Sequence, residues 1–152
     1  MYLDVFNKVV DSDNFTVGGG SASALAGAMA AGMASMVAKL SMAKPFNLTQ
    51  EEYTAMSKEL DELAQTLLKG SEQDTEAYCM IKDAFALPKS TDEEKEVRKQ
   101  AVRDAAYQAA LVPKNNGYNN KRVYELVCRL EGSSNPACLS DPVSYTHLTL
   151  PT

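Results

Sequence analysis

The sequence contains no tryptophan, one histidine and three cysteines, and these shortages limit the chemistry open to the protein. Cys79, Cys128 and Cys138 show no CxxC or Cys/His spacing, so no metal site is predicted. Their odd number, together with the absence of a signal-peptide pattern after Met1, favours reduced thiols and a cytoplasmic location. The single histidine, His147, lies close to the C-terminus, so acid–base chemistry would fall to carboxylates, lysine, tyrosine or water.

Basic runs and strand patterns are also missing. Asp and Glu total 20 against 15 Lys and Arg, giving a net charge of −5, and the cations are not clustered. Non-specific nucleic-acid binding needs clustered cations, so no nucleic-acid partner is predicted. No segment alternates polar and apolar residues over the length of a strand, and this excludes a β-sheet fold.

One uncharged stretch, Ser21–Ala38, approaches the length of a membrane span. Alanine, glycine and serine dominate it, and they gain little free energy from membrane insertion compared with leucine, isoleucine or phenylalanine. The composition therefore favours a buried helix of a soluble protein over a spanning helix, and no membrane partner is predicted.

Apolar residues recur at spacings of three and four along the rest of the chain, which predicts helices. We expect helices over residues 1–10, 21–43, 49–85, 91–113 and 121–131, with a polar turn at 114–120. Capping boxes at Thr49–Glu52 and Thr91–Glu94 begin two of them, and Gly132 follows the last. The fold class predicted is an all-α bundle with long helices.

The stretch from residue 21 to 43 has small residues at every fourth position on two faces. These are Ala24, Ala28 and Gly32 on one face, and Ser23, Gly27, Ala31 and Ser35 on the other. A glycine inside a helix costs about 1 kcal/mol relative to alanine, and close packing on both sides would offset that cost. We therefore predict a central helix surrounded by others.

Three glycines, Gly18-Gly19-Gly20, directly precede this helix, and Ser21 begins it. Glycine can adopt backbone angles that are costly for other residues. The free N–H groups and the dipole at a helix start favour an anionic or electron-rich group of a ligand. No Lys-Ser/Thr pair follows at Walker spacing, so the segment is not a P-loop. It is either a ligand-binding turn or a tight turn with a structural role alone.

Asp74 falls on an apolar stripe with Leu63, Leu67, Ala77 and Ile81. A carboxylate on such a stripe is costly to bury unless it is paired or hydrogen-bonded. It is therefore either a structural partner of another helix or an acid–base or substrate-orienting group.

Four blocks of sequence follow one another in an informative order. They are Gly18–Ser21 with the small-residue helix through Val37, then Asp74-Thr75-Glu76-Ala77-Tyr78, then Leu87-Pro88-Lys89-Ser90-Thr91 with Glu93-Glu94-Lys95 and Arg98, and finally Asn135-Pro136-Ala137-Cys138-Leu139-Ser140-Asp141. Together they resemble the formiminotetrahydrofolate cyclodeaminase/methenyltetrahydrofolate cyclohydrolase family over Met1–Asp141.

This resemblance implies an all-helical homodimer that binds a folate between helices. The family releases ammonia from 5-formiminotetrahydrofolate with ring closure, or interconverts 5,10-methenyl- and 10-formyltetrahydrofolate with water. Neither reaction needs a metal or a redox cofactor, so we expect a tetrahydrofolate derivative as substrate and no cofactor. The sequence does not choose between the two reactions. A non-catalytic helical dimerisation module and an inactive truncated remnant are the alternatives.

The resemblance also suggests site residues. The candidate catalytic carboxylates are Asp74 and Asp141. The candidate substrate-binding residues are Gly18, Gly19, Gly20, Ser21, Asn135, Ser140, Lys39 and Lys89, with the lysines as cations for the glutamyl tail of a folate. Ser140 and Asp141 equally suit a helix N-cap or, for the carboxylate, recognition of the N–H groups of a pterin.

The end of the chain departs from the family pattern. Family members continue after the Ser-Asp pair into further helices, whereas residues 142–152 match neither that pattern nor a helix. We therefore expect one cyclodeaminase-like domain over residues 1–141, truncated relative to the family, and a tail at 142–152 outside the fold.

Overall fold

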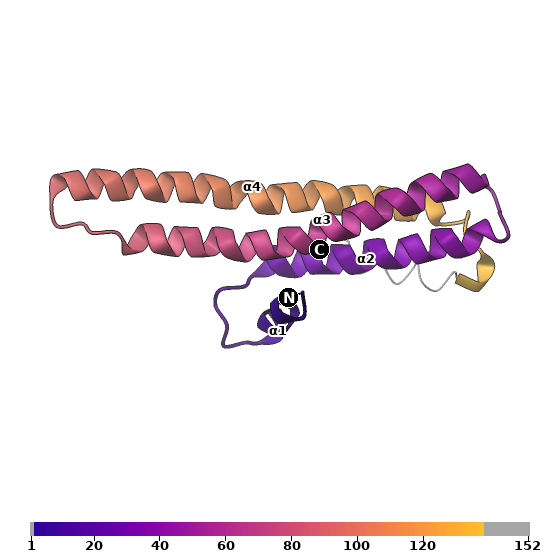
Figure 1. The fold of residues 1–152 in the computed structure, drawn as a ribbon, viewed down its shortest axis with the longest axis horizontal. Coiled ribbons are helices and arrows are strands. Elements are labelled where there is room, and N and C mark those ends of the chain that lie inside the picture. The colour runs from indigo at the N-terminus through magenta and orange to yellow at the C-terminus, as the bar shows by residue number, and fades with distance from the viewer. Residues whose placement is uncertain (1, 139–152) are drawn as a thin grey trace.

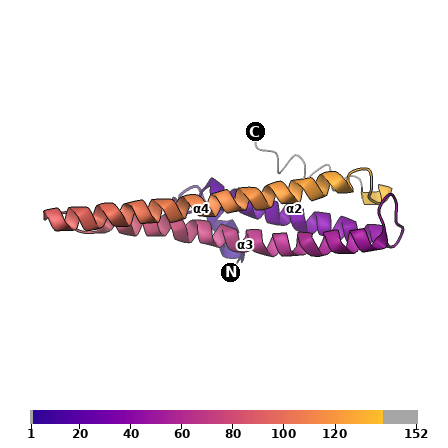
Figure 2. The same ribbon diagram turned by 90° about the horizontal axis from the view of Figure 1, so that it is seen from above.

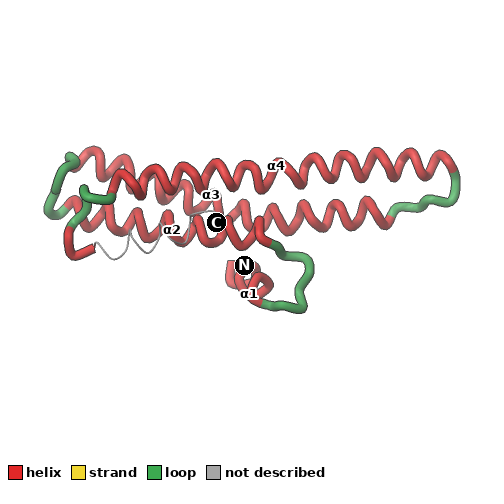
Figure 3. Tube along the Cα trace, turned by 180° about the vertical axis from the view of Figure 1, so that it is seen from behind, coloured by secondary structure: helices red, strands yellow, loops and turns green. Residues whose placement is uncertain are grey.

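The computed structural model describes residues 2–138, with side chains from residue 4 onward, and in this part of the chain helices are joined by loops (Figure 3). Its helices are α1 (Tyr2–Val10), α2 (Gly19–Met42), α3 (Gln50–Ala86) and α4 (Asp92–Leu130), followed by a 3₁₀ turn at Pro136–Cys138. No strand occurs among these residues, so the all-α prediction is confirmed.

Helices α2, α3 and α4 lie side by side, and α1 packs near the start of α2 (Figure 1). The antiparallel pair α3–α4 is longer than α2 and projects well beyond its start (Figure 2). The core lies where all three long helices overlap. There, Tyr53, Met56, Leu60 and Leu67 of α3 and Val123, Leu126, Val127 and Leu130 of α4 pack against the alanines of α2.

Helix α2 is a core helix, but one stripe of its surface is open. By length and composition it is the one helix in the described range that could cross a membrane, yet 61% of its most apolar window is buried within the bundle. Met29, Met36 and Leu40 on its outer side are 53%, 40% and 48% exposed. Among the described residues, α2 is therefore covered by α3 and α4 but is not surrounded as the small-residue pattern predicted.

Two helix starts follow the sequence signals. The side chains of Thr49 and Thr91 each accept the backbone N–H of the glutamate three residues later, and each glutamate reaches back to the N-cap backbone. After α4, Gly132 takes a positive φ of 74°, which suits glycine at a helix end. Both capping boxes and the glycine at the helix end are confirmed.

The polar turn expected at residues 114–120 is wrong, because α4 runs through it without a break. Pro113 lies inside the helix, where a proline removes one backbone hydrogen bond and costs about 3 kcal/mol. Tertiary contacts hold the segment in place. The side-chain amide of Asn116 donates to the Gly70 carbonyl oxygen at 3.2 Å, and that of Asn120 donates to the Ser23 carbonyl oxygen at 3.2 Å.

Two glycines make room for these asparagines. A Cβ at Gly70 would lie 2.1 Å from Oδ1 of Asn116, and a Cβ at Gly27 would lie 1.7 Å from Oδ1 of Asn120. The polar residues that suggest a turn are thus the ones that α4 presents to its neighbours.

Replacing Gly70 with alanine is expected to lower the free energy of unfolding, although alanine is the better helix former. Its Cβ would displace Asn116, which is 4% exposed and has little room to move. Gly117→Ala is the matched control, since nothing lies within 4 Å of a Cβ there, and it should gain up to about 1 kcal/mol. Chemical denaturation measures both variants. Equal stabilisation by both would show that the Asn116 contact does not require a glycine.

Candidate active site

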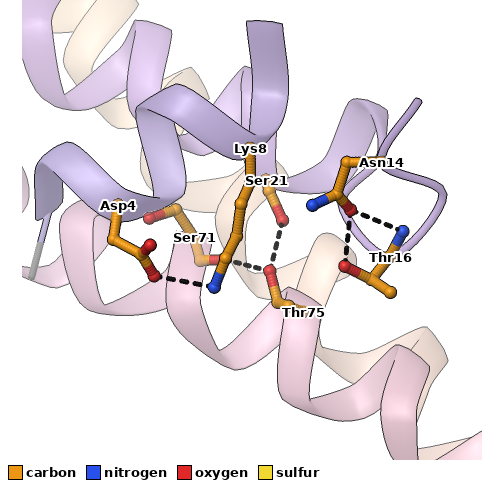
Figure 4. A network of polar contacts seen from close by, with 7 residues as sticks. All are labelled: Asp4, Lys8, Asn14, Thr16, Ser21, Ser71 and Thr75. Carbon is orange, nitrogen blue, oxygen red and sulfur yellow. Dashed lines mark hydrogen bonds and ion pairs between the residues drawn. The ribbon is translucent and has the colours of Figure 1, made fainter. Parts of the chain in front are cut away.

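The start of α2 and the second half of α3 bring the glycine turn and Asp74 together. Ser21 Oγ donates a hydrogen bond to Asp74 Oδ2 at 2.9 Å, across 53 positions of sequence. The same hydroxyl lies 3.3 Å from Thr75 Oγ1, which also donates weakly to the Ser71 carbonyl oxygen at 3.4 Å (Figure 4). The half-buried carboxylate is therefore held against α2 by a fixed hydroxyl.

Gly20 is the glycine that admits this carboxylate. A Cβ at Gly20 would lie 2.3 Å from Asp74 Oδ1 and 2.6 Å from its Cγ, so no larger residue fits without moving Asp74. The carboxylate packs on the first turn of α2, where the positive end of the helix dipole favours a negative charge. The protein's own carboxylate thus lies where the sequence suggested a ligand anion.

The expected unusual backbone angles of the glycine triplet are absent. Gly132 is the one described residue with a positive φ, and Gly18, the N-cap of α2, has an ordinary extended backbone with φ −123° and ψ −164°. Nothing lies within 4 Å of a Cβ placed on Gly18 or Gly19. The triplet serves two purposes: Gly20 makes room for Asp74, while Gly18 and Gly19 leave the helix start uncovered.

Two adjoining cavities open beside Asp74. The inner one, of about 210 Å³, is lined by Phe15, Thr16, Gly18, Asp74, Tyr78, Ile81 and Ala109. The outer one, of about 390 Å³, is lined by Asp11, Asp13, Asn14, Phe15, Thr16, Tyr78 and Lys82. They share the walls formed by Phe15, Thr16 and Tyr78. Pockets of roughly 300–1,000 Å³ are typical of small-molecule sites, and the two together fall in this range.

The loop between α1 and α2 is shaped by its own side chains. Asn14 Oδ1 accepts hydrogen bonds from the backbone N–H of Thr16 at 2.9 Å and from its hydroxyl at 2.6 Å (Figure 4). Asp11 Oδ1 accepts the backbone N–H of Asp13 at 3.1 Å. These local bonds mimic backbone turns, so the loop that carries Phe15 is ordered without strained angles.

A larger cavity, of about 770 Å³, lies elsewhere between α3 and α4. It is lined by Thr66, Gln73, Glu76, Ala77, Met80, Gln108, Leu111, Val112, Asn115, Asn116, Tyr118 and Asn119. Glu76 is the one ionisable carboxylate in this lining, and neither Asp74 nor the glycine turn reaches it. Size alone therefore does not identify the site, and the residue types favour the cavities beside Asp74.

Lys39 does not reach the cavities beside Asp74. It lies on the same helix as Ser21, about 27 Å away at roughly 1.5 Å per residue. Its Nζ pairs with Asp61 Oδ2 at 2.7 Å. Hydrogen bonds from Lys39 and from Ser35 lower the pKa of the Asp61 carboxyl. Within one chain, Lys39 is therefore paired with Asp61 and does not face the cavities beside Asp74.

Asn135 and Lys89 also lie apart from Asp74. The backbone N–H of Asn135 donates to Ser41 Oγ at 3.0 Å, near the opposite end of α2 from the glycine turn. Lys89 is exposed in the loop joining α3 to α4, at the far tip of the projecting pair (Figure 1). Ser140 and Asp141 lie outside the described residues. The binding or catalytic roles of these four residues stay predictions.

Sequence reasoning missed Phe15, Thr16, Tyr78 and Lys82 as functional candidates. A signal existed for two of them, because Asp74, Tyr78 and Lys82 are spaced four residues apart and therefore share one face of α3. Phe15 and Thr16 had no such signal, since a loop has no periodicity. In the described part of the chain, no three His, Cys, Asp or Glu side chains are grouped as a metal site would need.

Comparisons with known proteins agree on one family. The family model described as formiminotransferase-cyclodeaminase matches residues 2–149. The chain is 38% identical over 112 residues to methenyltetrahydrofolate cyclohydrolase of Methylorubrum extorquens, covering 73% of this chain and 54% of that protein. It is 26% identical over 140 residues to formimidoyltransferase-cyclodeaminase of Rattus norvegicus, covering 91% of this chain and 26% of that protein.

A similar solved structure also carries a cyclodeaminase name. Formiminotetrahydrofolate cyclodeaminase from Thermotoga maritima superposes with a TM-score of 0.78 at 25% identity, covering 95% of this chain and 68% of that one. The chain spans about half the length of the bacterial cyclohydrolase and about a quarter of the rat protein.

Proposed function

Because the chain belongs to the formiminotransferase-cyclodeaminase family, we propose that it acts on a tetrahydrofolate derivative at Asp74, as a cyclodeaminase or a cyclohydrolase. The observation that carries the proposal is the Asp74 carboxylate, held by Ser21 at the start of α2 and open to a cavity. The names of the relatives include both activities.

In the deamination, one carboxylate moves one proton. The substrate enters with its formimino group on N5 as an amidinium cation and with a hydrogen on N10. N10 attacks the formimino carbon, and Asp74 takes the N10 proton as the C–N10 bond forms. Asp74 then passes this proton to the former formimino nitrogen, which leaves as ammonia when its bond to carbon breaks. The product is the 5,10-methenyl cation, so charge and atoms balance.

In the hydrolysis, the same carboxylate handles water. Asp74 takes a proton from a water molecule as its oxygen adds to the methenyl carbon. The C–N5 bond then breaks, N5 receives one proton, and the hydroxyl proton is released to solvent as the 10-formyl group forms. Both reactions thus need one carboxyl beside the N5–C–N10 centre, and each can use Asp74 as general base and then general acid.

A carboxylate also suits the charge of the reacting centre. The amidinium and the methenyl group are both cations, and a nearby negative charge stabilises them, more strongly where water is excluded. Neither reaction transfers electrons, and a carboxyl group can move the protons of both, so we propose that the protein uses no redox cofactor and no metal. A cytoplasmic location, where folate compounds are available to an enzyme, is part of the same proposal.

Parallel assays test the proposed activity on the full chain. Ammonia release from 5-formiminotetrahydrofolate measures deamination, and loss of the methenyl absorbance measures hydrolysis. Turnover in either assay supports the proposal and decides the reaction. If neither occurs while the chain melts cooperatively, the protein is a helical interaction module; if it also fails to melt cooperatively, it is a folding-deficient remnant.

We also propose a homodimer that buries the open stripe of α2. The stripe carries Met29, Met36 and Leu40, all more than a third exposed in the single chain, and Gly32, with nothing within 4 Å of a Cβ. A partner helix can approach closely at such a glycine, and the methionines can adapt to its surface.

Met36→Asp is expected to shift the protein from dimer to monomer, because it would place a charge in an apolar interface. Val97→Asp, at another exposed apolar position on α4, is the matched control and should leave the dimer intact. Sedimentation velocity separates the two states. A wild-type chain that sediments as a monomer at micromolar concentration would contradict the assembly.

A further inference from the structure

Phe15 is exposed to an unusual degree for its side chain. At 81% exposure it is the most exposed large hydrophobic side chain among the described residues, and an uncovered phenyl ring forgoes the free energy of burial. Its loop is ordered by the Asn14 hydrogen bonds, so the exposure is built into the fold. Tyr78, also exposed at 45%, shares both cavities with it.

The two rings come from different elements and line the same space. Phe15 stands on the loop before α2, and Tyr78 lies one helical turn after Asp74 on α3. A flat ligand that contacts both rings therefore also lies close to the Asp74 carboxylate in the inner cavity. Aromatic rings favour stacked or edge-on contact with other rings, which makes this space suited to a planar heterocycle.

The charges of the outer cavity select which half of a folate enters. Asp11 and Asp13 line it with a single cation, Lys82, so carboxylates outnumber ammonium groups there. The carboxylates of a glutamyl tail would be repelled. The amino and ring N–H groups of a pterin, in contrast, are donors that carboxylates accept well.

We propose that Phe15 and Tyr78 hold the reduced pterin of the substrate by the flat pyrimidine half of its ring system, with its N–H edge toward Asp11 and Asp13 and its N5 toward Asp74. This assignment rests on the proposed function and adds the recognition of the substrate to it. The aromatic pair positions the ring, and the proton transfers remain with Asp74.

Calorimetric titration with 5-formyltetrahydrofolate, which is not turned over by a ring-closing deamination, tests the pair. Phe15→Ala and Tyr78→Ala should each weaken binding by about tenfold to a hundredfold, the range found when a stacked aromatic is removed. Tyr78→Phe should bind as wild type, since it keeps the ring. Tyr107→Ala is the matched control, because Tyr107 is 64% exposed on α4 and lines neither cavity beside Asp74.

A second ligand distinguishes the two halves of the folate. 6-Methyltetrahydropterin lacks the benzoylglutamate group, and the variants should weaken its binding by the same factor. A loss seen with the folate alone, or no binding of the pterin to wild type, would overturn the assignment of the pterin. Dissociation of a dimer by Phe15→Ala in sedimentation would also overturn it, because the ring would then belong to a protein interface.

Kinetics separate this inference from the proposed function. Phe15→Ala should raise KM by a larger factor than it lowers kcat, since the ring binds the substrate but moves no proton. If wild type turns over a folate and both alanine variants keep its KM and its affinity, the aromatic pair has no role and the enzyme assignment stands. If wild type binds and turns over no folate compound, the proposed function itself fails.

Discussion

Replacing Asp74 with asparagine is expected to lower kcat by about 10²–10⁴-fold, the usual contribution of general acid–base catalysis. Asparagine keeps the shape of the side chain, and its oxygen can still accept the hydrogen bond from Ser21. It cannot take a proton from N10 or from water. Substrate affinity should fall by a much smaller factor than kcat, since only the attraction between the carboxylate and the cationic centre is lost. The free energy of unfolding should change little, because the removal of a half-buried charge offsets the loss of its favourable position at the start of α2.

The fold provides a close control for this variant. Asp61 is also a carboxylate on α3 that accepts a hydrogen bond from a serine of α2, here Ser35 at 2.6 Å. It pairs with Lys39 and is exposed, and it lies far along α3 from the cavities. Asp61→Asn should leave kcat unchanged and cost little stability, as exposed ion pairs do.

Steady-state kinetics on both variants, with thermal melts as a check of folding, complete the experiment. If the Asp74 variant turns over within a few-fold of wild type, Asp74 has no part in the proton transfers. The next carboxylate to test would be Asp141, which lies outside the described residues.

Gly20→Ala should reduce turnover by roughly a hundredfold, since small displacements of a catalytic group carry costs of that order. A Cβ there would lie 2.3 Å from Asp74 Oδ1 and would push the carboxylate away from Ser21. Helical content should not fall, because alanine stabilises the first turn of a helix relative to glycine. The loss would thus appear in the kinetics without unfolding.

Gly19→Ala separates the two roles of the glycine triplet. Nothing lies within 4 Å of a Cβ at Gly19, so this variant should retain Asp74 in place and stay active. In addition, Gly20→Ala should cost little in an Asp74→Asn background, because both changes act on the same group. If Gly19→Ala is as damaging as Gly20→Ala, the turn itself contacts the substrate, and the proposal that Gly20 acts through Asp74 fails.

Local signals predicted much of the fold. The capping boxes at Thr49 and Thr91 identified the starts of α3 and α4, because a threonine and a glutamate three residues apart satisfy free N–H groups without help from elsewhere. The break expected at Pro113 failed for the opposite reason. The penalty for a proline can be read from the local sequence. The contacts that accompany the continuous helix cannot, because Asn116 bonds to α3 and Asn120 bonds to α2, both far away in the sequence.

In the candidate site, too, local signals identified single residues but not the contacts between them. Gly20 and Asp74 could each be selected from the sequence, one by its place before a small-residue helix and the other as a carboxylate on an apolar stripe. The approach of Asp74 to Gly20 joins residues more than fifty positions apart, and no helical period relates them. Phe15 could not be selected as a site residue from the sequence, because a loop residue has no periodic partner.

By itself, then, the sequence determined the all-α class, the starts of α3 and α4, the family and the residue types available for acid–base chemistry, since periodicity, capping and motif order are properties of neighbouring positions. Only the tertiary structure decided that Gly20 makes room for Asp74 and that Phe15 and Tyr78 face one cavity. It also decided that Lys39, Lys89 and Asn135 lie away from the cavities beside Asp74. The physical reason is that such contacts depend on the packing of whole helices, which brings side chains together across distances that local preferences do not encode.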